Sequence, residues 1–173
     1  MARFNGTLFL LLLISSTALA QGPSYVPCNE LGFYKALGDP SVFIDRTGNN
    51  LSLATKATVA ILKKSIMKNR ALPSWLFPLN GWLTPGFGSD SAMPEDGCSI
   101  WRGDEWYTRA VFIPHDAPDG HGFIAINLSK KKSFVLITKD NFIKNKISQE
   151  TIAVIGNEED IRDIASAYPA LVQ

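Results

Sequence analysis

The clearest hydrophobic pattern in the chain is an amphipathic stretch over residues 51–67. Its apolar residues fall on one helical arc, namely Leu51, Ala54, Val59, Leu62 and Ile66. The opposite arc carries Lys56, Lys63, Lys64 and Lys68. Asn69 and Pro73 follow, and both residue types commonly end helices. The pattern therefore predicts one long helix in the first half of the chain.

The second half alternates short apolar runs with polar turns. Four runs are rich in β-branched and aromatic residues and predict strands: 106–113, 123–128, 133–138 and 151–155. Short connections, such as the polar turn at 127–132, favour an antiparallel meander. Residues 28–37 are expected to form a short helix or coil, and residues 70–98 an irregular segment with at most one short strand.

A second helix is expected to start at Asn157, because acidic residues fill the turn that follows it. Its inner face would consist of Ile161, Ile164, Ala165 and Tyr168. Helices on either side of a run of strands predict an α+β domain, with a central antiparallel sheet of about four to five strands flanked by helices.

The first twenty residues have the pattern of a secretory signal peptide. Arg3 precedes a short apolar run at 8–14, and Ala18-Leu-Ala20 provides a cleavage site after Ala20. The run is shorter than a membrane-spanning helix needs, although an uncleaved anchor is the alternative. Residues 21–173 then form a single domain of 153 residues. Loss of Arg3 leaves 16 cations (17 − 1) and 16 anions, so net charge indicates neither a nucleic acid nor a membrane partner.

Two cysteines remain, Cys28 and Cys98, and an even number in an exported chain indicates one disulfide. Their separation of 70 positions would stabilise the fold by about 4 kcal/mol through loop closure. The alternative is a reactive thiol at Cys98, within Asp96-Gly-Cys-Ser99.

The candidate chemistry lies in residues 114–122, which join two predicted strands. Nine residues are long for such a connection, and excess length often serves a function. Two prolines stiffen the segment, and Gly120 and Gly122 allow tight turning. We therefore expect a rigid protruding loop that carries four polar residues, His115, Asp116, Asp119 and His121.

The sequence of this loop also fits three other interpretations. The first is a polar turn that carries a histidine by chance. The second is an active site in which His115 or His121 is a general base oriented by Asp116. The third is a metal site of two histidines and an aspartate. Neighbouring residues on one loop rarely face each other as a catalytic dyad requires, and no motif places a nucleophile. The chain has only two histidines. We therefore expect no catalytic residues, no metal and no cofactor.

Pro114, His115 and Asp116 match the Cys-Lys-Pro-His-Asp-Cys signature in the protruding loop of the inhibitor of vertebrate lysozyme family, which this chain resembles. Ile113 replaces the lysine, and Phe112 and Ala117 replace the two cysteines, so the disulfide that braces the family's loop is absent. Further similar segments follow in the family's order: residues 54–57 (Ala-Thr-Lys-Ala), 72–76 (Leu-Pro-Ser-Trp-Leu), 84–85 (Thr-Pro) and 103–107 (Gly-Asp-Glu-Trp-Tyr). The resemblance covers residues 50–140.

The resemblance implies a periplasmic inhibitor of C-type lysozyme in a Gram-negative bacterium. The lysozyme-binding loop would be Pro114, His115, Asp116 and Ala117, with Asp119 and His121 at its rim. His115 would lie between the enzyme's two catalytic carboxyl groups, accepting a hydrogen bond from the protonated one and donating one to the ionised one. Asp116 would orient the ring or accept a hydrogen bond from a donor in the cleft. In this arrangement Cys98 pairs with Cys28 and fastens the N-terminal segment to the sheet.

The expected partner is a C-type lysozyme or a related muramidase or lytic transglycosylase, and some family members form homodimers. Residues 95–119 carry six anions against two cations, which predicts an acidic patch around the loop that would attract a basic lysozyme. Solvated turn residues are the simpler explanation of these charges. Two other functions remain open: an immunity protein against an injected peptidoglycan-degrading toxin, and a small periplasmic hydrolase.

Overall fold

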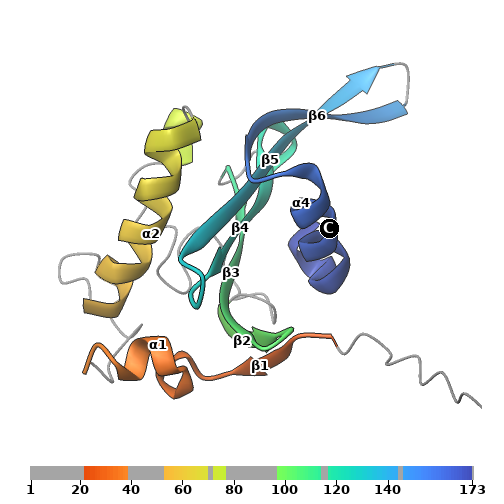
Figure 1. Ribbon diagram of the computed structural model, residues 1–173. Helices are drawn as coiled ribbons and strands as arrows, with labels where there is room; N and C mark the ends of the chain where they lie inside the picture. The colour runs from red at the N-terminus through yellow and green to blue at the C-terminus, as the bar shows by residue number, and fades with distance from the viewer. Residues whose placement is uncertain are drawn as a thin grey trace, which may run out of the picture.

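A six-stranded antiparallel sheet forms the centre of the protein, and its strands lie side by side in chain order (Figure 1). The computed structural model describes residues 22–38, 53–69, 72–76, 97–113, 117–143 and 146–172. The strands are β1 (Ser24–Val26), β2 (Gly97–Trp101), β3 (Asp104–Phe112), β4 (His121–Asn127), β5 (Lys132–Ile143) and β6 (Lys146–Ile155). The predicted α+β class and antiparallel meander are confirmed, and the sheet has more strands than the four to five expected.

The extra strands are β1 and β2, at one edge of the sheet. β1 has three residues, and β2 lies at the end of a segment expected to be mostly irregular. A tight turn joins β2 to β3, where Arg102 and Gly103 both have positive φ angles of 50° and 77°. Runs this short carry little periodic signal, which explains why the sequence pattern did not predict both strands.

Helices cover both faces of the sheet (Figure 1). On one face lie α2 (Leu53–Asn69), within two residues of the predicted helix, and the short α1 (Gly32–Lys35). On the other face lies α4 (Glu158–Ala167), whose first turn is capped as expected, because the Asp160 amide donates to the Asn157 side chain at 2.7 Å. Short 3-10 turns complete the described chain: η1 (Cys28–Glu30), η2 (Ser74–Leu76), η3 (Ala117–Asp119) and η4 (Pro169–Val172).

The central strands are buried on both faces, so their side chains divide between two cores. The core beneath α2 contains Tyr107 and Val111 of β3, whereas the core beneath α4 contains Trp106 of the same strand. The alternation of side chains along a strand sends neighbouring residues to opposite faces. Strands buried on both sides appear in the sequence as nearly continuous apolar runs, such as the run from Phe123 to Ile126.

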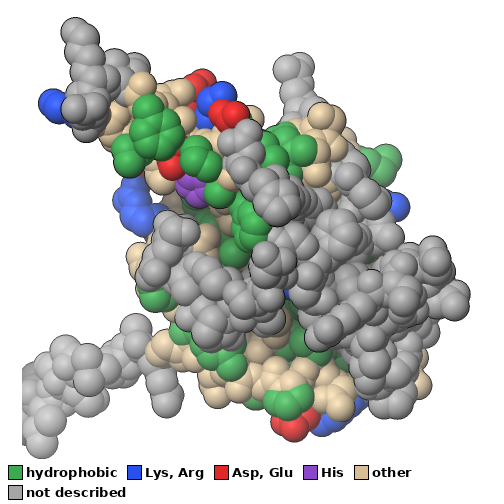
Figure 2. All heavy atoms as spheres, turned by 180° about the vertical axis from the view of Figure 1, so that it is seen from behind, with side chains coloured by type: hydrophobic (Ala, Val, Ile, Leu, Met, Phe, Trp, Pro, Cys, Tyr) green, Lys and Arg blue, Asp and Glu red, His purple; other side chains and the backbone are tan. Residues whose placement is uncertain are grey.

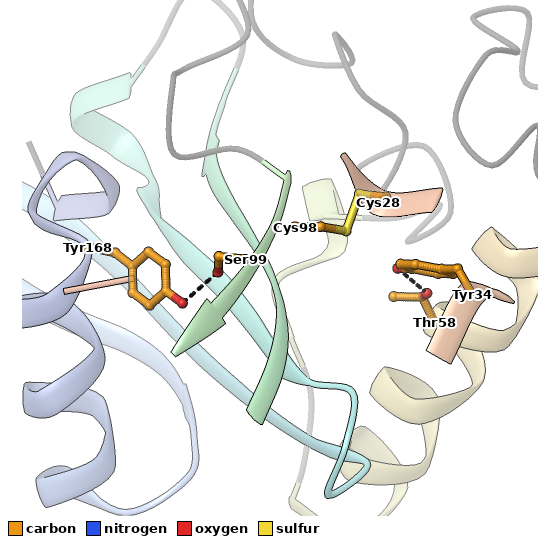
Figure 3. The surroundings of a disulfide bond; sticks show 6 residues. All are labelled: Cys28, Tyr34, Thr58, Cys98, Ser99 and Tyr168. Atoms are coloured by element: carbon orange, nitrogen blue, oxygen red, sulfur yellow. Dashed lines mark hydrogen bonds between the residues drawn. A yellow bond between two sulfur atoms is a disulfide. The ribbon is translucent and has the colours of Figure 1, made fainter. Parts of the chain in front are cut away.

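A disulfide links Cys28 to Cys98, with an Sγ–Sγ distance of 2.08 Å (Figure 3). Cys98 pairs with Val26 across β1 and β2, so the bridge fastens the N-terminal segment to the sheet as expected. The predicted pairing is confirmed, and neither cysteine is a free thiol. Figure 3 also shows two buried hydrogen bonds on either side of the bridge: Tyr34 to Thr58 at 2.9 Å and Tyr168 to Ser99 at 2.8 Å.

No helix in the described ranges is long and apolar enough to cross a membrane. The predicted signal peptide, residues 1–20, lies outside the described residues.

Candidate functional site

The candidate site is the end of the sheet at which β3 passes into β4. Pro114, His115 and Asp116, the predicted binding residues, lie outside the described residues. The structure does describe both ends of their loop, from the β3 side at Ile113 and from the β4 side at Ala117, Pro118 and Asp119, all three of which are exposed. These two ends are the points at which the chain leaves β3 and returns to the sheet at β4.

Backbone hydrogen bonds close the base of the loop. The Ile113 amide donates to the carbonyl of Gly120 at 2.8 Å, and the Gly120 amide donates to the carbonyl of Ala117 at 3.1 Å. Gly120 lies against Trp75, since a Cβ atom added to it would be 2.8 Å from Trp75 Cζ2 and 3.1 Å from Ile113 Cδ1. The Leu-Pro-Ser-Trp segment, residues 72–75, therefore packs against the loop base through Trp75.

His121 joins this loop to the β5–β6 hairpin. Its Nδ1 lies 3.1 Å from the carbonyl oxygen of Ala117, and its Nε2 lies 3.1 Å from Thr138 Oγ1 and 3.3 Å from Gln149 Nε2. A carbonyl can only accept, so these partners fit a ring that donates from Nδ1 and accepts at Nε2. The side chain is only 18% exposed, with Asp140 Oδ1 3.9 Å from Nε2.

The position of His121 differs from the expectation in one respect. The sequence pattern predicts a strand that starts at Phe123, with His121 in the loop just before it, whereas β4 begins at His121 itself. The sequence pattern did not predict this start because Gly122 follows His121, and glycine is rare in strands. Here it is required, because it has φ +152° and an added Cβ would lie 1.9 Å from the backbone oxygen of Leu136.

Asp119 provides a further link between the loop and β5. Its carboxylate lies 2.8 Å from Lys139 Nζ, and the two side chains are 52% and 41% exposed. A pair this exposed contributes little stability by itself, about 0–1 kcal/mol. Together with the His121 contacts to Ala117 and Thr138, however, the ion pair holds η3 against β5, beside the part of that strand that β4 does not reach.

The acidic patch expected around the loop is split by the fold. Asp104 and Glu105 begin β3, whereas the loop follows its end at Phe112, roughly 26 Å away along an extended strand. Hydrogen bonds from Lys130 and Asn127 lower the pKa of Asp104 despite its partial burial. Glu105 instead accepts hydrogen bonds from the amides of Gly32 and Phe33, at 2.6 and 2.9 Å, and so caps α1.

The predicted patch combines residues that are close in sequence but not all close in space. Of the six anions counted, only Asp119 is described near the loop, because Glu95, Asp96 and Asp116 lie outside the described residues. One of the two cations, Arg109, is buried within β3 with 1% exposure. The described part of the site therefore provides positioning contacts and little net charge.

Sequence reasoning missed the residues that hold the loop, namely Trp75, Thr138, Lys139 and Gln149. They come from three separate segments, and only the sheet register and the packing of η2 bring them to the loop. In the described ranges, no three His, Cys, Asp or Glu side chains gather at a spacing that could hold a metal ion. Comparison with protein-family models, curated proteins and solved structures finds no match to this chain.

Proposed function

We propose that this protein is a periplasmic inhibitor of C-type lysozyme and that residues 114–116 enter the substrate cleft of the enzyme. The observation that carries the proposal is the anchored loop base. Both loop ends are held by the sheet, through the Ile113–Gly120 backbone bond and the ring of His121. A segment already held in place loses less conformational entropy on binding, and this raises its affinity.

The chemistry of the loop tip suits two catalytic carboxyl groups. A glycosidase keeps one carboxyl protonated and the other ionised, and a neutral imidazole at His115 can accept from the first and donate to the second. Occupation of both groups, with the loop filling the cleft, excludes the sugar. The protein itself has no catalytic role in this proposal, and it uses no cofactor.

A lysis assay tests the proposal directly. The mature protein, at about equimolar ratio, is expected to slow the clearing of a cell-wall suspension by C-type lysozyme, and His115→Ala is expected to abolish most of this effect. Retention on immobilised lysozyme separates the alternatives, because an immunity protein binds only its own toxin and a hydrolase turns over a substrate without binding lysozyme. Full lysozyme activity in a large molar excess of folded protein would refute the proposal.

A further inference from the structure

The outer part of the β5–β6 hairpin extends beyond the sheet as a two-stranded ribbon. β4 begins at His121, which pairs with Thr138, so for residues 139–143 β6 is the sole strand partner among the described residues. Five residues carry the ribbon roughly 17 Å past the start of β4. Figure 1 shows it projecting past the rest of the described chain, at the upper right.

The ribbon carries an exposed apolar pair near its end. Phe142 and Ile147 are direct cross-strand partners, and each is 65% exposed. Figure 2 shows hydrophobic side chains over this outer part of the hairpin, at the upper left. Neither residue belongs to either core. Scattered exposed apolar residues are ordinary, but a stacked pair on a projecting ribbon is typical of a contact surface.

The pair shares a face with the contacts that hold the loop. Side chains alternate along a strand, so Phe142 lies on the same face of β5 as Thr138 and Asp140. Ile147 lies likewise on the same face of β6 as Gln149, which pairs with Asp140. His121 contacts both Thr138 and Gln149 on this face and the loop at Ala117. The base of the loop and the apolar pair therefore lie at the same end of the sheet.

We infer that Phe142 and Ile147 form a second contact with the enzyme whose cleft the loop enters, an inference that rests on the proposed function. A specific interface needs about 20–30 residues on each side, and a loop of four residues supplies only a small part of that. The occupant is the enzyme surface that borders the cleft, with an apolar patch facing the pair. Residues 139–150 carry three lysines, one aspartate and one glutamate, a net charge of +1, whereas binding to an anionic membrane takes a cluster of about four to eight cations.

A titration of C-type lysozyme against matched variants tests the inference. Phe142→Gln/Ile147→Gln is expected to bind about tenfold or more weakly than the parent protein, because two apolar contacts are lost. Ile100→Gln on β2 is the control, since it removes an exposed apolar side chain at the opposite end of the sheet and should bind as the parent does. The melting temperature of each variant is measured beside its titration. If the double variant melts lower than the parent, Phe142→Gln and Ile147→Gln are titrated singly instead.

The outcomes are distinguishable. If the parent protein does not bind lysozyme, both the proposed function and this inference are overturned. If the parent binds and the hairpin variants bind within twofold of it, the proposed function stands and the inference is wrong. If sedimentation shows that the parent self-associates and the variants do not, with lysozyme affinity unchanged, the pair joins two copies of this chain instead. Weaker lysozyme binding by the hairpin variants, with an unchanged control, supports the inference.

Discussion

Replacement of His121 by alanine tests whether this histidine holds the loop in place, as distinct from His115, which is expected to bind the enzyme. The ring makes three contacts, at 3.1, 3.1 and 3.3 Å, and its side chain is only 18% exposed. A net contribution of about 0.5–1.5 kcal/mol per hydrogen bond predicts a loss of about 2 kcal/mol in the free energy of unfolding. His115→Ala, in the predicted binding loop, should change stability by only about 0.5 kcal/mol and weaken inhibition more strongly.

The same replacement should also weaken inhibition, because the loop is then released at Ala117. Ordering one residue costs about 1–2 kcal/mol, so a loop freed by one or two residues should bind about tenfold to a hundredfold more weakly. His121→Asn and His121→Gln make the test specific. The asparagine amide can replace the Nδ1 donor to Ala117, whereas the glutamine amide reaches the position of Nε2, near Thr138.

We expect His121→Asn to retain most of the affinity and His121→Gln to retain more stability than affinity. Urea unfolding measures stability, and titration against lysozyme at a temperature where every variant is folded measures affinity. An unchanged inhibition constant for folded His121→Ala would refute the reasoning, because it would mean that the His121–Ala117 contact does not position the loop.

Three further predictions follow from other parts of the structure. Replacing both Cys28 and Cys98 by serine should lower the free energy of unfolding by about 4 kcal/mol for a separation of 70 residues, without changing inhibition; a loss below about 1 kcal/mol in guanidinium unfolding would contradict this. Gly120→Ala should lower stability by about 1–3 kcal/mol, and an added Trp75→Leu should restore part of it in the same unfolding assay, because the new methyl group meets the indole. The pKa of Asp104 is lowered in the folded state, so the stability that its carboxylate contributes is present above about pH 4 and lost as the pH falls toward the folded pKa. The free energy of unfolding of Asp104→Asn should therefore fall less steeply than that of the parent as the pH is lowered through this range. Equal pH dependence in parent and variant would contradict the prediction.

The sequence predicted the elements whose burial is regular. α2 and α4 each have one apolar face, and the central strands are apolar runs because both their faces are covered. The sequence pattern did not predict the outer part of the β5–β6 hairpin, because this part is not regularly buried. Of its described residues, 139–142 are half-buried or exposed and 146–150 are all exposed, so no alternation of apolar and polar residues marks them as strands. The pairing of β5 with β6, and not local composition, makes this segment extended.

The candidate site was predictable as a loop and not as a set of contacts. The prolines, glycines and histidines of residues 114–122 mark the loop in sequence. The residues that hold it are distant in sequence: His121 meets Gln149 across 28 positions, and Trp75 reaches Gly120 from before β2. Such contacts depend on sheet register and on the packing of η2, which hydrophobic periodicity does not determine.

The contacts at the loop base bear on the disulfide that the resembled family has and this chain lacks. A bridge between positions 112 and 117 would close a loop of about five residues, worth about 2 kcal/mol in the loop-closure model. The Ile113–Gly120 backbone bond and the His121–Ala117 bond, at about 0.5–1.5 kcal/mol each, supply a similar total. The Asp119–Lys139 ion pair adds a small, salt-dependent part. Noncovalent contacts of this size at the loop base can therefore contribute about as much free energy as the missing bridge, and they do so without a disulfide that a reductant could open.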